Sequence, residues 1–216
     1  MNKIGVFGGT FNPVHKGHEI TAVEFYDKFD LDKLIIIPAN MPPHKIIDEK
    51  VSALQRFEMC ELCFEKYRRE NNYNYKIEVS DIEIKKDGVS YTYDTIKTLR
   101  KIYPDDIIYF LAGSDMFLYL ENWYKYKKLL EMCVFVIAFR NNNDNDFEQK
   151  KVLTLQNNLI NQGYKIELLK NSPFEISSTE LREKLKSGGF DSTDLKKYIS
   201  PEVLNYIKER KIYVLQ

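Results

Sequence analysis

Short apolar segments alternate with segments of helical periodicity from one end of this chain to the other. The apolar segments have the length of single buried strands, which are expected at residues 3–7, 33–38, 75–84 (with a kink), 107–112, 133–139 and 164–169. Strands that alternate with helices are typical of a parallel sheet covered on both faces. The pattern therefore predicts an α/β protein with a Rossmann-like, doubly wound, mostly parallel sheet and a small C-terminal helical portion.

Apolar residues recur at helical spacing between these strands. Helices are expected at residues 18–29, 51–69 and 91–103, from the turn at 113–115 to about 132, up to about 161, and from 179 to about 210. Ser52 is a candidate N-cap for the second of them. The run 141–146 (NNNDND) is expected to be a solvated loop. We predict one domain over residues 1–216, with a helical subregion at about 176–216.

Charge and hydropathy exclude two classes of protein. Lys plus Arg and Asp plus Glu both total 32, so the net charge of zero argues against a nucleic-acid binder that relies on bulk electrostatics. The longest apolar run, 132–139, is far shorter than the ~20 residues that cross a bilayer. Gly8 and Gly9 interrupt any apolar signal segment near the start. We expect a cytoplasmic protein without a membrane span.

The three cysteines cannot form a disulfide framework. Cys60 and Cys63 have the spacing of a redox or metal motif, but they lie inside a helical pattern and no second pair completes a zinc site. We interpret them as buried structural thiols, and we predict no metal site built from protein side chains.

Residues 8–20 (GGTFNPVHKGHEI) follow the first strand and open the first helix. A glycine turn at that junction exposes main-chain N–H groups at the positive end of the helix, which favours an anion such as phosphate. His15 and His18 are three residues apart and lie on one face of the first turn. Gly17 between them lets a ligand approach the main chain. The alternative is a glycine turn with a histidine cap; the segment matches neither the dinucleotide fingerprint nor the P-loop.

This His-x-Gly-His turn resembles the hallmark of the HxGH nucleotidyltransferases. The resemblance covers nearly the whole chain in order, through PANMPPHK (38–45), VSYTYDTI (89–96), LAGSDMFLYLENW (111–123) and ISSTELR (176–182). Within the family the chain is most similar to members that act on nicotinate mononucleotide. Asn12 stands where many members have Asp, and its amide oxygen can replace the carboxylate as an acceptor.

The resemblance implies a reaction and its partners. The 5′-phosphate of nicotinate mononucleotide attacks the α-phosphorus of ATP, giving deamido-NAD and pyrophosphate in NAD biosynthesis. The protein supplies no nucleophile, because transfers of this kind depend on positioning and on stabilising charge. The implied cofactor is Mg²⁺, carried mainly by the ATP phosphates, since the sequence shows no dedicated carboxylate cage. A homo-oligomer is left open.

The resemblance also implies roles for individual residues. His15 and His18 are the expected catalytic residues, with His18 the first choice for stabilising the transition state. The expected ATP contacts are Gly8, Gly9, Thr10, Phe11, Asp115, Ile176, Ser177, Ser178, Thr179 and Arg182. The expected mononucleotide contacts are Asn40, Lys45, Thr92, Tyr119 and Trp123.

The residues alone leave several of these roles open. Thr92 lies at an expected helix start, where its amide suits the nicotinate carboxylate. Trp123 and Tyr119, one helical turn apart, form either an aromatic platform or the edge of the core. Lys45 is otherwise an ordinary surface lysine. Residues 177–179 are otherwise a helix cap, with 179–182 as a capping box that lacks its Glu.

Two other functions are compatible with the same motifs. One is an adenylyltransferase of the same superfamily that acts on nicotinamide mononucleotide or phosphopantetheine. The other is a nucleotide-binding regulator without turnover, against which the intact His15, His18 and Arg182 argue.

Overall fold

In the described part of the computed structural model, six strands form one sheet in which every pair is parallel. The strands are β1 (Lys3–Gly9), β2 (Lys33–Pro38), β3 (Ile77–Val79), β4 (Ile107–Gly113), β5 (Val134–Phe139) and β6 (Ile166–Lys170). The structure describes residues 1–43, 51–65, 67, 75–86, 88–139, 146–170, 172, 174, 176–188 and 194–213. The predicted Rossmann-like α/β class is confirmed.

The strand order β3-β2-β1-β4-β5-β6 places the first strand in the middle of the sheet. The chain leaves β1 in one direction through β2 and β3, and later in the other direction through β4 to β6. Val6 of β1 pairs with Ile35 on one side and with Phe110 on the other. A doubly wound sheet opens a crevice where its winding reverses, at the carboxyl ends of the central strands. The carboxyl ends of β1 and β4 are therefore the expected place for a ligand.

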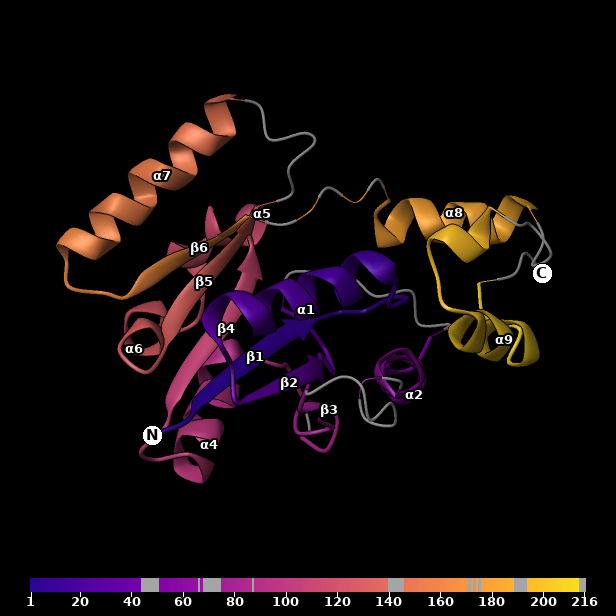
Figure 1. Ribbon diagram of the computed structural model, residues 1–216, viewed down its shortest axis with the longest axis horizontal. Helices are drawn as coiled ribbons and strands as arrows, with labels where there is room; N and C mark the ends of the chain where they lie inside the picture. Colours follow the sequence, from indigo (N-terminus) through magenta and orange to yellow (C-terminus); the bar gives the residue numbers. More distant parts are fainter. Residues whose placement is uncertain are drawn as a thin grey trace.

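The helices flank the sheet on both faces (Figure 1). They are α1 (Lys16–Phe29), α2 (Ala53–Phe64), α4 (Thr92–Ile102), α5 (Ser114–Phe117), α6 (Tyr126–Leu130), α7 (Asp146–Asn161), α8 (Ser178–Gly188) and α9 (Pro201–Glu209), with 3-10 turns η1 (Leu120–Asn122) and η2 (Leu195–Lys197). In Figure 1 the C-terminal helices α8 and α9 lie at the opposite end of the molecule from α7. No helix in the described ranges is long and apolar enough to cross a membrane.

Alternation along the strands divides the core into two clusters. Leu34 and Ile36 of β2 face the cluster that also contains Phe25 of α1 and Val203 of α9. Ile35, between them, faces the cluster on the α4 and α6 side. The first cluster joins the sheet to the C-terminal helices, so burial of α8 and α9 supports the shape of the central crevice.

Two expected elements are wrong in their extent. The third strand ends at Val79, and residues 82–85 form a turn closed by a bond from Lys85 N–H to Asp81 C=O (2.9 Å). β3 is short because β2 pairs with it only over residues 34–36 of β2. The last bond of the pair runs from Ser80 N–H to Ile36 C=O. The second helix, α2, ends at Phe64, and Tyr67 is again helical, while residues 66, 68 and 69 of the expected helix lie outside the described residues. Its Ser52 cap is confirmed, since Ser52 Oγ accepts from Gln55 N–H (3.1 Å).

Two expected helices are broken. Between Gly113 and residue 132 the chain forms α5, η1 and α6, interrupted by extended backbone at Trp123 and by Lys125 with φ of +54°. The break lets the Trp123 ring pack on Phe110 and Phe135. The expected tail 179–210 is broken before Pro201, which occupies the first turn of α9 behind the Ser200 cap, where proline is tolerated. The helices at 16–29, 92–102 and 146–161 confirm the expectations within a few residues, while 141–145 lies outside the described residues.

Candidate active site

A cavity of about 920 Å³ lies at the carboxyl ends of β1 and β4. Its walls come from the loop after β1, the first turns of α1, α4 and α8, and the turn that follows η1. This volume is within the range of ordinary ligand sites, and the place is the switch point of the sheet. Most of the candidate site residues that the sequence identified line this cavity.

His15 and His18 cap the helix α1 reciprocally. His15 is the N-cap, and its Nδ1 accepts from Gly17 N–H (3.1 Å). His18, three residues on, accepts from His15 N–H through its own Nδ1 (3.3 Å). The two rings lie 3.8 Å apart between centroids, and both line the cavity. The prediction that the pair shares one face of the first turn is confirmed.

These caps determine which ring nitrogen is the donor. A neutral imidazole has one protonated nitrogen, and a nitrogen that accepts from a main-chain N–H is unprotonated. Both neutral rings therefore carry their proton on Nε2. The pair thus presents two N–H donors at the positive end of a 14-residue helix.

Neighbouring aromatic rings hold the two histidines in place. Phe174 stacks on His15 (centroids 5.8 Å apart, planes within 7°), and Phe11 meets the His18 ring edge-on at 5.0 Å. A Cβ added at Gly17 would lie 2.6 Å from Phe174 Cδ1 and 3.0 Å from the His15 ring. These rings leave no space for a side chain at position 17, and Gly17 itself lines the cavity, so the access of a ligand to its main chain stays a prediction.

The loop after β1 is tied to α8. Arg182 Nη1 donates to Asn12 C=O (2.7 Å), and Ser178 Oγ donates to Pro13 C=O (3.1 Å). Gly8, Gly9, Thr10 and Phe11 of this loop all line the cavity, as do Ile176, Ser177, Ser178, Thr179 and Arg182. Two segments more than 160 residues apart in sequence therefore form one wall.

The cap of α8 differs from the expected one. Ser177 and Glu180 form a capping box in which Ser177 N–H donates to Glu180 Oε2 (2.7 Å) and Glu180 N–H donates to Ser177 Oγ (3.2 Å). The cap is therefore two residues earlier than the expected 179–182 box, and a Ser-x-x-Glu pattern in the sequence could have identified it. The main-chain bond from Ser177, and then the bond from its hydroxyl, lower the pKa of the Glu180 carboxyl.

The opposite wall is formed by the start of α4 and by Trp123. Tyr91 is the N-cap of α4 and makes no side-chain cap bond, and Thr92 is the first helical residue. Trp123 packs edge-on against Phe110, with centroids 6.2 Å apart. Its buried Nε1 has no hydrogen-bond partner within the described part of the chain. Thr92 and Trp123 both line the cavity, so the structure brings these two predicted residues together.

Tyr119 is not part of this wall. It is 65% exposed and is not among the residues that line the cavity, because the helix that was expected to align it with Trp123 is broken. Tyr124 takes the place beside Trp123, with its ring 4.8 Å from Tyr91. The pairing of Tyr119 with Trp123 is therefore wrong.

Of the remaining predicted contacts, the structure places only Asp115 at the cavity. Asp115 in the first turn of α5 lines the cavity. Asn40 does not line it; its side-chain N–H donates to Lys86 C=O (3.1 Å). Lys45 lies outside the described residues.

Sequence reasoning missed two charged residues near the cavity. Arg56 of α2 is 1% exposed and contacts the loops after β1 and β2. Glu83 lines the cavity and accepts a bond from Thr95 in α4. Neither residue belongs to a recognisable motif, so nothing in the sequence pointed to them. Within the described ranges there is no group of three or more His, Cys, Asp and Glu residues that could hold a metal.

Comparison with known proteins agrees with this geometry. A family model described as cytidylyltransferase-like matches residues 6–184. The chain is 38% identical over 208 residues to a probable nicotinate-nucleotide adenylyltransferase of Fusobacterium nucleatum, covering 94% of this chain and 100% of that one. It is 34% identical over 215 residues to a protein of the same description from Clostridium botulinum, covering 99% of each.

Solved structures share the fold. A nicotinic acid mononucleotide adenylyltransferase of Plasmodium falciparum, in complex with NaAD, superposes with a TM-score of 0.74 at 21% identity and covers 99% of this chain and 98% of that one. The same enzyme with APC gives a TM-score of 0.72.

Proposed function

The chain belongs to the cytidylyltransferase-like family, among its nicotinate-nucleotide adenylyltransferases, and from this membership we propose how its own residues bind and align the two substrates. The reaction is transfer of the adenylyl group of ATP to nicotinate mononucleotide, which gives deamido-NAD and pyrophosphate in NAD biosynthesis. An oxygen of the mononucleotide 5′-phosphate forms the new bond to the α-phosphorus, and the bond to the β-phosphate breaks. No protein nucleophile takes part.

The ATP phosphates bind at the start of α1. This assignment is supported by the two Nε2–H donors of His15 and His18 beside the first-turn amides of α1. Arg182 lines the same wall, and two of its five N–H donors are used within the described part of the chain. Gly8 to Phe11, Asp115 and residues 176–179 complete the ATP site. His18 stabilises the charge that develops on the transferring phosphate, since a preorganised donor is strongest where water is excluded.

The pyridine end of the mononucleotide binds between the start of α4 and Trp123. The first-turn amides of α4 receive no side-chain cap from Tyr91, so they suit the nicotinate carboxylate at Thr92. The Trp123 ring supplies an aromatic surface for the pyridine. Asn40 and Lys45 remain proposed contacts of the mononucleotide.

Mg²⁺ is the proposed metal, and the triphosphate brings it. Among the described residues, four carboxylates line the cavity, of which Glu180 and Glu83 accept bonds from Ser177 and Thr95. Asp115 and Glu148 are the lining carboxylates that suit contact with the ion or its waters. This donor set fits a cation that keeps phosphate oxygens and waters as ligands. When bound, the ion neutralises phosphate charge.

We also propose a single domain over residues 1–216, while the cytoplasmic location stays a prediction.

One observation carries the proposal: the His15–His18 pair and the Thr92–Trp123 wall line the same cavity. The test is pyrophosphate release from ATP and Mg²⁺, with nicotinate or nicotinamide mononucleotide as the acceptor and His18→Ala as the control. Fast release with the acid alone is expected. Equal rates with both acceptors would indicate an enzyme that accepts nicotinate and nicotinamide mononucleotide alike. No pyrophosphate release with either mononucleotide would favour phosphopantetheine as the acceptor, or a regulator without turnover.

A further inference from the structure

Hydrogen bonds connect the phosphate-binding loop with the start of α4 along the cavity wall. They involve side chains and main-chain groups of six residues, which are Thr10, Arg56, Asn40, Ser90, Glu83 and Thr95. These residues come from the ends of β1, β2 and β3 and from α2 and α4. We call this set the loop-to-helix network. Its two ends lie beside the two proposed binding regions of the cavity.

Arg56 forms the phosphate-loop end. Its Nη1 donates to Thr10 C=O (2.7 Å), and its Nη2 donates to Asn40 C=O (2.9 Å). Arg56 is in no ion pair within the described ranges, and burial lowers the pKa of its guanidinium. The charge is held by two carbonyls, one from each loop. A fork of two donors fixes both direction and distance, as a single ammonium would not.

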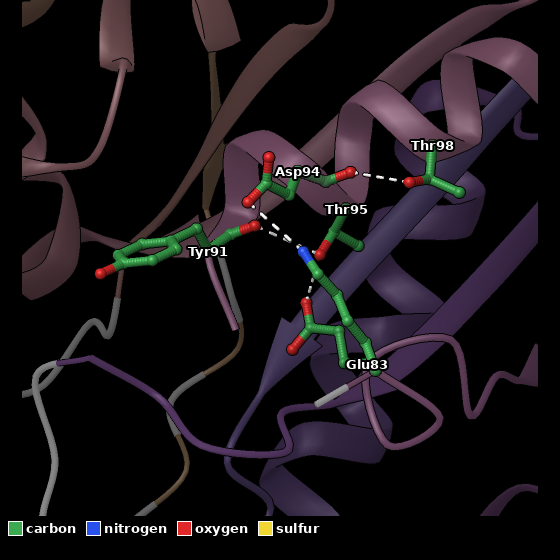
Figure 2. Close-up of polar contacts among 6 residues, drawn as sticks. Glu83, Tyr91, Asp94, Thr95 and Thr98 are labelled. Atoms are coloured by element: carbon green, nitrogen blue, oxygen red, sulfur yellow. Dashed lines mark hydrogen bonds and ion pairs between the residues drawn. The ribbon is translucent and has the colours of Figure 1, made fainter. Parts of the chain in front are cut away.

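Glu83 forms the α4 end. Thr95 Oγ1 lies 2.6 Å from Glu83 Oε1 but 3.4 Å from Tyr91 C=O, so its one proton goes to the carboxylate. Figure 2 shows the Glu83 carboxylate directed at Thr95, one turn below the start of the helix. Thr95 is 9% exposed, so this bond is shielded from water.

Ser90 joins the two ends. Its Oγ accepts from Asn40 N–H (3.1 Å), and it directly precedes Tyr91, the N-cap of α4. Its hydroxyl is close enough to Glu83 to lower the pKa of that carboxyl. The bonds of the network run from Arg56 to its two carbonyls, from Asn40 N–H to Ser90 Oγ, and from the Thr95 hydroxyl to Glu83. Main-chain bonds from Ala39 to Gly9 and from Ser90 to Met41 run beside the network.

Burying the charged side chains of Arg56 and Glu83 costs free energy of desolvation. Burial raises the pKa of the Glu83 carboxyl, whereas the bonds from Thr95 and Ser90 lower it. Burial likewise opposes the charge on Arg56. Apolar side chains of similar size would often stabilise a wall as well or better. What the charged groups add is a fixed geometry between two loops and a helix.

We propose that Arg56 and Glu83 are positioning residues that set the separation between the phosphate-binding loop and the start of α4. This inference rests on the proposed function, in which the mononucleotide spans these two places. Its pyridine end is held at Thr92 and its 5′-phosphate must lie in line with the α-phosphorus of ATP. A misplacement of about 1 Å in such an alignment can cost ~10²-fold in rate. ATP lies along the α1 and α8 walls, and the network meets its site only at the Thr10 carbonyl, so changes at the α4 end should affect ATP binding less than mononucleotide binding.

The test compares two threonines of α4. Thr95→Val removes the hydroxyl that binds Glu83, and Thr95→Ser retains it. Thr98→Val is the matched control, because Thr98 is exposed and its hydroxyl donates only to Asp94 C=O (2.9 Å) on the same helix (Figure 2). We expect Thr95→Val to raise KM for nicotinate mononucleotide and to lower kcat, by about 10-fold or more in kcat/KM. KM for ATP should stay within about 2-fold. Thr95→Ser and Thr98→Val should resemble the wild type.

Glu83→Leu and Arg56→Lys test the network from its two ends. Glu83→Leu removes both acceptor oxygens, so the Thr95 bond is lost, and it should reproduce the kinetics of Thr95→Val. The double variant Glu83→Leu/Thr95→Val should be no slower than the slower single variant, because both changes break one bond. Arg56→Lys should raise KM for the mononucleotide more than KM for ATP. The Tm of each variant distinguishes altered positioning from partial unfolding.

Three outcomes would overturn the proposal. They are equal effects on the KM values of both substrates, multiplicative effects in the double variant, or a lower Tm with unchanged kinetics. The wild type separates this proposal from the proposed function. If wild-type protein turns over nicotinate mononucleotide and the variants match it, only the network is rejected. If the wild type fails with this acceptor, the function itself is rejected.

Discussion

The hydroxyl of Tyr213 donates a hydrogen bond to Oδ1 of Asn12, 201 residues away in the sequence. Both residues are buried, at 6% and 7% exposure. Asn12 C=O also accepts from Arg182, so the loop that carries the histidines is held from two C-terminal segments at once. The amide oxygen of Asn12 thus accepts a hydrogen bond, as expected for a residue that stands where many family members have Asp.

Tyr213→Phe is expected to lower the free energy of unfolding by about 1 kcal/mol, the usual value of one buried hydrogen bond. Urea unfolding measures it. The variant should also raise KM for ATP, because the loop after β1 loses a support. Asn12→Ala removes the same bond from the other side, so the double variant should be no less stable than Asn12→Ala alone. Additive losses of stability would mean that the two residues act separately.

His18→Ala is expected to lower kcat by ~10²-fold, because it removes one preorganised donor. It also removes the acceptor for His15 N–H, so the helix cap is weakened. His18→Asn separates the two effects: its side-chain oxygen can replace Nδ1 as the acceptor, but no donor remains at the position of Nε2. Steady-state kinetics and Tm should show a slow but stable Asn variant. Wild-type turnover in either variant would remove His18 from the mechanism.

Trp123→Ala is expected to raise KM for nicotinate mononucleotide about 10-fold, since it removes an aromatic contact and its surface. KM for ATP should change less, because the ring lies on the α4 side of the cavity. Trp123→Phe is the control that keeps a ring against Phe110. Equal increases for both substrates, with a large fall in Tm, would identify Trp123 as a core residue only.

The thiols of the native protein are expected to resist iodoacetamide at neutral pH. Cys60, Cys63 and Cys133 are all buried thiols. Burial raises the pKa of Cys133 to about 12 and that of Cys60 well above its usual value, so little thiolate is present. Mass spectrometry should detect labelling only after unfolding. Rapid labelling of Cys60 or Cys63 in the folded protein would reinstate the redox interpretation of their spacing.

Glu180→Gln is expected to destabilise the protein in a pH-dependent way. The capping bonds from Ser177 hold the pKa of Glu180 below its unfolded value of 4.5. A lowered pKa stabilises the fold above 4.5, and this contribution is lost as the pH falls through the folded pKa. The difference in Tm between the wild type and Glu180→Gln should therefore be constant well above pH 4.5 and shrink below it. A difference that does not vary with pH would contradict a charged cap.

Local patterns in the sequence were sufficient to predict that each of the six strands exists, and to predict the cap of α2 and the histidine pair. His15 and His18 meet because three residues along a helix always bring side chains to one face. Ser52 caps α2 through Gln55, again three residues away. The carboxyl ends of parallel strands share one edge of the sheet, so the place of the cavity could also be predicted. These features depend on neighbours in sequence or on a general rule of topology.

Tertiary packing alone decided the parts that the sequence did not predict. Burial of Trp123 against Phe110 and Phe135 breaks the expected helix and brings Tyr124, instead of Tyr119, to the cavity. Arg56 and Glu83 belong to no motif, and their partners are 46 and 12 residues away. Hydrogen bonds between distant segments form only after the sheet has brought the loops together. A chain therefore determines its periodic elements locally, whereas the contacts that align two substrates depend on the assembled fold.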